Sequence, residues 1–191
     1  YLGDELSYTG GDAVQLSVGY GQACVTTETG NVRCYGQYIG GTNWHDVYSG
    51  GDAEWVVNSS YAACIKTAGP DLTCLGWNVT EPNWDTTGTP LPAGGGHYAL
   101  CLLMEEGDVD CMNNGYNTVG QTAGYWEGDA VDADGQFDMS CAVTGGGDVQ
   151  CWGRLNQSIP HHRWSLGAVG AVSVSVSNTD ICYAAASGDI T

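Results

Sequence analysis

The sequence predicts an all-β protein built from about five similar repeats, and three observations support this prediction. Nine cysteines recur at a nearly constant interval. Short apolar runs such as AVQLSV and AVSVSVS are rich in valine and lie beside glycine or polar turn residues, which is typical of strands joined by tight turns. The 191 residues contain 30 glycines and 11 tyrosines but one phenylalanine, and no long run places apolar residues at helical spacing.

The cysteine spacing sets the length of the repeat. The first eight cysteines form four pairs whose members are ten positions apart: Cys24 and Cys34, Cys64 and Cys74, Cys101 and Cys111, and Cys141 and Cys151. Successive pairs begin 40, 37 and 40 residues apart, and Cys182 follows after 41 more. A period of this size indicates a repeat architecture. We therefore interpret residues 1–191 as a single repeat domain with repeats at about 1–36, 37–76, 77–113, 114–153 and 154–191.

The segment between the two cysteines of each pair predicts a β-hairpin. These segments are CVTTETGNVRC, CIKTAGPDLTC, CLLMEEGDVDC and CAVTGGGDVQC. In three of them a glycine precedes Asn or Asp, which is turn chemistry because glycine adopts positive φ without a Cβ clash. Apolar residues flank the turn, so each of the two predicted strands carries one cysteine.

Two further patterns complete the repeat. GDAVQLSVG at 11–19 aligns with GDAEWVVNS at 51–59, GDAVDADGQ at 128–136 and GAVSVSVSN at 170–178, which predicts an additional strand before each hairpin. A linker with one tryptophan follows each complete hairpin: Trp44, Trp84, Trp126 and Trp164. Each repeat is therefore about 40 residues of short strands and turns.

The last repeat is predicted to be incomplete. CYAAASGDIT places Cys182, Gly188, Asp189 and Ile190 in the expected columns, and the second cysteine would be residue 192. We expect the chain to be cut inside a repeat, or to be ordered only to this point. Cys182 is then predicted to be unpaired for want of a partner, with a reactive thiol or an intermolecular bridge as alternatives.

The cysteine pairs predict one disulfide in each hairpin. Their spacing does not match a zinc site, whose ligands usually come in pairs two to four residues apart. Cysteines on facing strands of a hairpin lie close enough to bridge. Each bridge closes a short loop and adds roughly 2–3 kcal/mol of stability by constraining the unfolded chain. Persistent disulfides require an oxidising compartment, so we predict an extracellular or cell-surface location.

Three sequons agree with that location. They are NSS at Asn58, NVT at Asn78 and NQS at Asn156. We predict N-linked glycans first at Asn78 and Asn156, which follow a hairpin on a predicted loop, and less strongly at Asn58, which lies in a predicted strand.

Two repeats resemble those of the regulator of chromosome condensation family, in its cysteine-bearing, extracellular type. The matching residues are His97, Cys101, Gly107, Val109 and Cys111 in the third repeat, and Cys141, Ala142, Gly147, Val149, Cys151, Trp152 and Gly153 in the fourth. The resemblance implies a β-propeller-like array of about five four-stranded repeats, the last incomplete, with protein binding as the usual function. A closed ring, part of a larger ring and an open spiral all remain possible for five repeats.

The charge argues against some partners. Four Lys and Arg face 22 Asp and Glu, for a formal net charge of −18. Such a chain is repelled by nucleic acid and by anionic lipid, so we expect neither nucleic-acid binding nor membrane insertion. We also expect no cofactor and no metal. DADGQFD at 132–138 resembles a calcium loop, but it lacks the terminal Glu and overlays strand positions of the other repeats.

The predicted function is a non-enzymatic extracellular scaffold that binds protein or itself, for example as a subunit of a surface filament or sheath. The spacing of Ser, His and Asp residues indicates no catalytic triad, so a secreted hydrolase is the least favoured hypothesis. A soluble recognition module, such as a lectin or an enzyme inhibitor, is the alternative. The four tryptophans either pack inside the repeats, which their recurrence favours, or form an exposed binding stripe.

Overall fold

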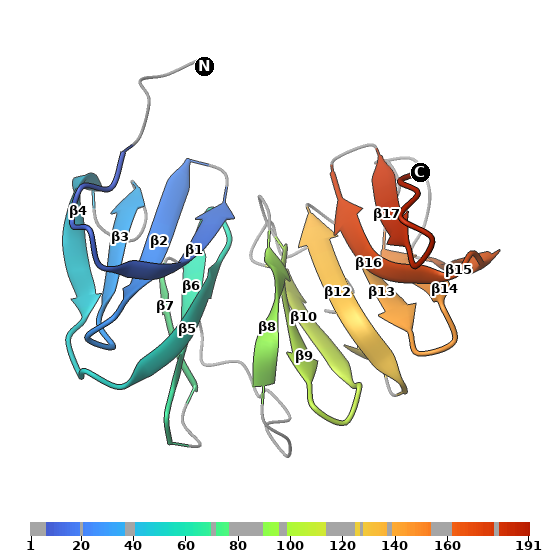
Figure 1. The fold of residues 1–191 in the computed structure, drawn as a ribbon, viewed down its shortest axis with the longest axis horizontal. Helices are drawn as coiled ribbons and strands as arrows, with labels where there is room; N and C mark the ends of the chain where they lie inside the picture. Colours follow the sequence, from blue (N-terminus) through green and yellow to red (C-terminus); the bar gives the residue numbers. More distant parts are fainter. Residues whose placement is uncertain are drawn as a thin grey trace.

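The computed structural model describes residues 7–19, 21–36, 41–69, 72–76, 90–95, 99–113, 125–126, 128–136, 139–153, 162–177 and 180–191. The regular secondary structure of these residues consists of β-strands alone, which confirms the all-β prediction. The strands form five antiparallel sheets. The sheets follow one another along the molecule as they do along the chain (Figure 1).

Each sheet is a meander of strands that are consecutive in the sequence. Sheet 1 contains β1 (Ala13–Gly19), β2 (Gln22–Thr27), β3 (Val32–Gly36) and β4 (Gly41–Tyr48). Sheet 2 contains β5 (Ala53–Asn58), β6 (Ala62–Thr67) and β7 (Leu72–Gly76). Sheet 3 contains β8 (Pro90–Gly95), β9 (Ala99–Met104), β10 (Val109–Asn113) and β11 (Tyr125–Trp126). Sheet 4 contains β12 (Ala130–Gln136), β13 (Met139–Thr144), β14 (Asp148–Gly153) and β15 (His162–Ala168). Sheet 5 contains β16 (Ala171–Val176) and β17 (Ile181–Ala185).

Three of the four predicted tryptophan linkers are strands, and the fourth, with Trp84, lies outside the described residues. Trp44, Trp126 and Trp164 lie in β4, β11 and β15, the fourth strands of sheets 1, 3 and 4. Sheets 1, 3 and 4 therefore end one strand later than the corresponding predicted repeats. The four-stranded repeat is confirmed in these three sheets, and the last sheet has two strands in the described residues.

The hairpin register brings the paired cysteines directly opposite each other. Cysteines of the second and third strands face one another in sheets 1 to 4, and all four pairs are bridged. The Cα atoms of each pair lie 4.0 to 4.1 Å apart. The prediction of one disulfide in each complete hairpin is confirmed.

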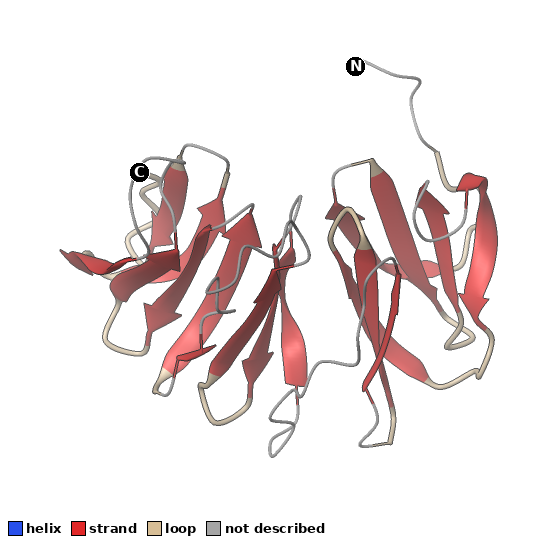
Figure 2. Ribbon diagram, turned by 180° about the vertical axis from the view of Figure 1, so that it is seen from behind, coloured by secondary structure: helices blue, strands red, loops and turns tan. Residues whose placement is uncertain are grey.

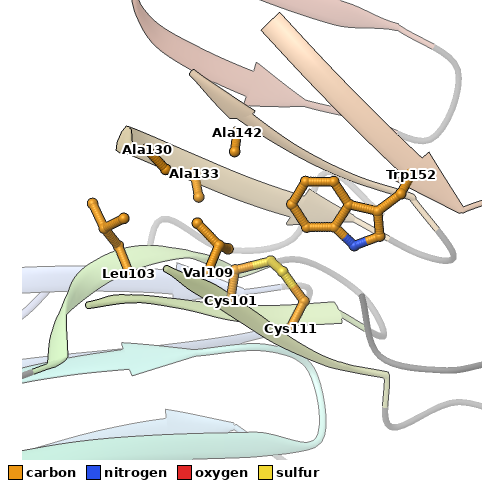
Figure 3. Packing of buried hydrophobic residues seen from close by; sticks show 8 residues of the cluster. All are labelled: Cys101, Leu103, Val109, Cys111, Ala130, Ala133, Ala142 and Trp152. Carbon is orange, nitrogen blue, oxygen red and sulfur yellow. A yellow bond between two sulfur atoms is a disulfide. The ribbon is translucent and has the colours of Figure 1, made fainter. Parts of the chain in front are cut away.

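The core lies between sheets rather than inside them. We call the face of a sheet that meets the preceding sheet its front face, and the face that meets the next sheet its rear face. Between sheets 3 and 4, the Cys101–Cys111 bridge and Val109 on the rear of sheet 3 pack against Ala133 and Trp152 on the front of sheet 4 (Figure 3). The disulfides therefore contribute apolar surface to the junctions as well as restricting the unfolded chain.

The described sheets form a row whose two end sheets each have one neighbouring sheet. Sheets 1 and 5 lie at opposite ends of the molecule, as Figure 1 shows from one side and Figure 2 from behind. The front face of sheet 1 and the rear face of sheet 5 consequently have no neighbouring sheet in the described part of the chain.

Candidate interaction surfaces

The first strands of the five sheets, β1, β5, β8, β12 and β16, line one shared hollow of about 620 Å³. We call them the inner strands. The sequences of β1, β5, β12 and β16 align position by position from Ala13, Ala53, Ala130 and Ala171, and we number the positions from these residues. Pro90 holds position 1 of β8, but the bulge of that strand lies later, between Pro92 and Gly95. Side chains at positions 3 and 5 of β1, β5 and β12 contact the next sheet, while those at position 4 of β5, β12 and β16 contact the preceding one.

Polar side chains at positions 3 and 5 join sheet 1 to sheet 2. Gln15 accepts a hydrogen bond from the backbone N–H of Val56 (2.8 Å) and donates one to the Val56 carbonyl (2.9 Å). The hydroxyl of Ser17 accepts from the backbone N–H of Asn58 (2.9 Å). These bonds satisfy backbone groups at the edge of β5 and fix the register of the two sheets.

The same positions join sheet 4 to sheet 5 with carboxylates. Oδ2 of Asp132 accepts from the backbone N–H of Val174 (2.8 Å). Oδ2 of Asp134 accepts from the backbone N–H of Val176 (2.7 Å) and from the hydroxyl of Ser175 (3.3 Å). Residues that resemble a calcium loop in the sequence thus serve as hydrogen-bond acceptors for the next strand.

Burial raises the pKa of Asp134 above its usual value. Hydrogen bonds from the backbone N–H groups of Val176 and Gly135 oppose this shift because they favour the charged form. The raised value means that removal of the carboxylate from water outweighs these bonds. Asp134 is therefore an acceptor whose charge is costly at this junction.

The hairpin turns provide a third link. The carbonyl of the turn glycine accepts a hydrogen bond from the backbone N–H at position 1 of the next inner strand. Ala53 donates to Gly30 (2.9 Å), and Ala171 donates to Gly147 (3.0 Å). In the same way, the backbone N–H of Ala130 donates to the carbonyl of Gly107 (3.0 Å). Gly30 has a φ of 70°, and an added Cβ would lie 2.4 Å from the backbone of Gly51. Only glycine meets both requirements.

The front face of sheet 1 exposes apolar side chains at positions 4 and 6, whose counterparts in sheets 2 and 5 are buried. Leu16 and Val18, at positions 4 and 6, are 61% and 62% exposed. The corresponding Val174 and Val176 of sheet 5 are 5% and 8% exposed because sheet 4 covers them. In the described part of the chain, this face has the composition of a junction, and no sheet packs on it.

An aromatic cluster joins β3 and β4 of the first sheet to the segment that precedes β1. The Tyr8 and Trp44 rings pack edge to face with centroids 5.1 Å apart, and Tyr35 lies 6.2 Å from Trp44. The Arg33 guanidinium lies 5.8 Å from the Tyr8 ring, which is a cation–π distance. Tyr35 occupies the position that Trp152 holds in sheet 4, where the side chain packs against sheet 3.

The rear face of sheet 5 is small and polar. Ser173 and Ser175 occupy positions 3 and 5 and are exposed. Cys182 lies opposite Ser175 in the ladder, so both side chains share this face. Cys182 is free and exposed, whereas the corresponding Cys24 and Cys141 are bridged and fully buried.

The predicted glycan sites have different outcomes. Asn58 is fully buried at the end of β5, where its Nδ2 donates to the carbonyl of Gln22 (3.5 Å). This position leaves no room for a glycan, because the amide lies inside the junction of sheets 1 and 2. Asn78 and Asn156 lie outside the described residues and stay predictions.

The tryptophans do not form one exposed stripe among the described residues. Trp44 is half-buried in the aromatic cluster, and its Nε1 donates to the Ser7 carbonyl (3.2 Å). Trp164 is half-buried against the core between sheets 4 and 5. The side chain of Trp126 and the whole of Trp84 lie outside the described residues. Binding through these tryptophans stays a prediction, and only Trp44 lies on the sheet with the exposed front face.

The described residues hold no group of three or more His, Cys, Asp or Glu side chains that could bind a metal ion. They also contain no helix long and apolar enough to cross a membrane. The links between inner strands were missed by the sequence analysis. The linking side chains have in common only an oxygen acceptor, as in Gln15, Ser17 and Asp132. The sequence feature that could have revealed these links is a polar residue at positions 3 and 5 beside apolar neighbours.

Solved structures of other proteins share this arrangement of sheets. Prp20p, the RCC1 protein of Saccharomyces cerevisiae, aligns with 77% of this chain and 46% of its own length, at a TM-score of 0.59 and 14% identity. Human WBSCR16 aligns with 90% of this chain and 57% of its own length, at a TM-score of 0.67 and 15% identity. The chain has a β-propeller fold. This confirms the fold implied by the resemblance to the regulator of chromosome condensation family.

An extracellular receptor domain has the same propeller fold. The ectodomain of the receptor kinase CR4 from Physcomitrella patens aligns with 94% of this chain and 53% of its own, at a TM-score of 0.65 and 16% identity. This propeller chain spans about half the length of the solved structures it matches. No protein-family model and no curated protein sequence matches it.

Proposed function

We propose that this chain is a non-enzymatic extracellular scaffold that binds protein, and that its partner is another copy of itself in a surface filament or sheath. The observation that carries the proposal is the apolar front face of sheet 1, where Leu16 and Val18 are exposed at positions that junctions bury elsewhere. A contiguous apolar face on a chain this acidic is typical of a protein-binding surface.

The similar structures support a protein-binding role. Prp20p was crystallised in work on its binding to Gsp1p and histones, and yeast RCC1 was crystallised bound to Kap60. Four disulfides support an oxidising compartment, and the ectodomain of CR4 provides an extracellular propeller of similar shape.

The acidic residues nearest the hollow support a structural role rather than catalysis. Asp132 and Asp134 line it, yet their carboxylates accept hydrogen bonds from the backbone of β16. A general acid or base needs a carboxylate directed at the substrate. Here these carboxylates hold two sheets together.

The hollow favours a second candidate, a soluble recognition module such as a lectin or an enzyme inhibitor. Inner strands of all five sheets line it, and a volume of about 620 Å³ is suited to a small ligand or an inserted loop. Glycan-array binding by a chain that stays monomeric would favour this candidate over the scaffold.

Sedimentation velocity across a wide range of concentration, with electron microscopy of the same samples, tests the scaffold. We expect the mass to rise with concentration and ordered polymers or closed rings to appear. A single species at monomer mass, at every concentration and at high salt, would contradict self-assembly. High salt belongs in the design because the net charge of −18 makes copies repel one another at low ionic strength.

A further inference from the structure

We propose that two copies join end to end, with the rear face of sheet 5 in one copy docked on the front face of sheet 1 in the next. The contact repeats the register that joins successive sheets within the chain. This inference rests on the self-assembly proposed above and specifies its geometry. A second copy is the occupant that the structure favours, because the two exposed sheet faces of the described chain carry the two halves of the same junction.

The internal junctions define what such a contact requires. Junctions 1/2 and 4/5 have an acceptor side chain at position 3 for the N–H at position 4, and another at position 5 for the N–H at position 6. Each also has a turn-glycine carbonyl that accepts from position 1. In junction 4/5 the apolar Val174 and Val176, at positions 4 and 6, pack with Cys141 of the preceding sheet. In junction 1/2 Val56 packs with Cys24 from position 4, and position 6 is the buried Asn58.

Sheet 1 supplies the donor half. Leu16 lies opposite Val25 in the ladder, as Val56 lies opposite Ile65 and Val174 opposite Tyr183. The shared register directs the N–H groups of Leu16 and Val18 away from β2, at the open edge of the sheet. Their side chains are the exposed apolar pair on the front face.

Sheet 5 supplies the acceptor half. Ser175 holds position 5, where Ser17 accepts from Asn58 in the first junction, and Ser173 holds position 3. The Ser175 hydroxyl donates to Asp134, so its lone pairs remain as acceptors. The turn glycine is Gly188, whose φ is 93° and whose missing Cβ faces no atom within 4 Å. Its carbonyl is placed to accept from Ala13 of the next copy.

The apolar surfaces also correspond. Cys141 and Val143 of sheet 4 belong to the core between sheets 4 and 5. Cys182 and Ala184 hold the corresponding positions in sheet 5. In the docked pair, Leu16 and Val18 of the next copy cover Cys182 and Ala184. A contact between two different faces can repeat without limit, so it produces a ring if the rotation closes and a filament if it does not.

A disulfide cross-link tests this register. In the junction of sheets 3 and 4, a Cβ at position 6 (Gly135) would lie 2.8 Å from Sγ of Cys101. The corresponding pair in the docked copies is Val18 and Cys182, so Val18→Cys should bridge to Cys182 of the neighbouring copy under mild oxidation with diamide. The matched control is Val14→Cys: Val14 is 59% exposed, but position 2 stays exposed in assembled junctions, as Val131 and Val172 show.

We expect Val18→Cys to form covalent multimers at least about tenfold faster than Val14→Cys, because docking holds the two thiols at a high effective concentration. Cys182→Ser in the Val18→Cys background should abolish them. Wild type, with Cys182 alone, gives the background. Non-reducing electrophoresis and intact mass provide the readout, and circular dichroism confirms that each variant is folded.

Sedimentation of the same proteins separates this register from self-assembly itself. If copies assemble but Val18→Cys cross-links no faster than Val14→Cys, the register is wrong and the scaffold stands. If the chain stays monomeric, both proposals fail. A second pair needs no thiol: Val18→Asp should weaken assembly by more than about tenfold, because it buries a charge, whereas Val14→Asp should leave it nearly unchanged.

Discussion

Between sheets 2 and 3, positions 3 and 5 of the inner strand hold Trp55 and Val57, whereas between sheets 4 and 5 they hold Asp132 and Asp134. Trp55 and Val57 pack with Leu100 and other apolar residues of β9. The backbone offers no donor at position 1 there, because Pro90 has no N–H.

The comparison shows that one geometry is held together by two kinds of chemistry. The apolar junction gains its stability from buried area, which is non-directional. The polar junctions add hydrogen bonds from specific side chains to specific backbone groups, which select the register. A surface with both an exposed apolar pair and backbone N–H groups at a sheet edge, such as the front of sheet 1, is therefore suited to a defined partner orientation.

Truncation of Trp55 should give the largest loss of stability. Trp55 is 8% exposed in the apolar junction, so Trp55→Ala removes a large buried side chain and leaves a cavity. We expect the free energy of unfolding to fall by about 3–5 kcal/mol, measured by urea denaturation of the oxidised protein. Val172→Ala, at an exposed position of β16, is the control and should change it by less than about 0.5 kcal/mol. A loss at Trp55 as small as the control would mean that this junction is not held by packing.

Removal of the Asp134 acceptor should be the next largest effect. Asp134→Ala leaves the backbone N–H of Val176 and the Ser175 hydroxyl without their partner at the junction of sheets 4 and 5. We expect a loss of about 2–3 kcal/mol. Hydrogen exchange gives the specific readout: the Val176 amide should lose protection, while the Val174 amide, bound by Asp132, should keep more of it. Equal loss at both amides would indicate that the sheet separates as a unit.

The features that the sequence predicted well are local ones. Turn chemistry at Gly30 and the spacing of Cys24 and Cys34 together determine a hairpin and its register, so the disulfides followed from short segments. The segment with Trp44 was harder, because a fourth strand with a bulge pairs irregularly and lacks a clear alternation of polar and apolar residues. The pattern predicts a linker, but the segment forms β4.

The contacts between sheets could not be predicted, because they join residues about 41 positions apart. Gln15 and Asp132 perform the same task with different side chains, so no repeated letter marks them. The burial of Asn58 was also invisible in the sequence. Its sequon is intact, and only the packing of sheet 1 against sheet 2 encloses it.

The smallest expected effect distinguishes the two junctions by pH. The pKa of Asp134 is raised by burial above its ordinary value of 3.8, so between these two values the folded state binds more protons than the unfolded state. The contribution of Asp134 to the free energy of unfolding therefore falls as pH rises through this window and is constant above it. Asp134→Asn does not titrate, so the stability of wild type relative to this variant should fall over the same range. Trp55→Ala, in the apolar junction, should show a difference from wild type that does not change with pH there. A wild-type advantage over Asp134→Asn that grows with pH would mean that hydrogen bonds to the carboxylate outweigh its burial, and that the charge stabilises the junction.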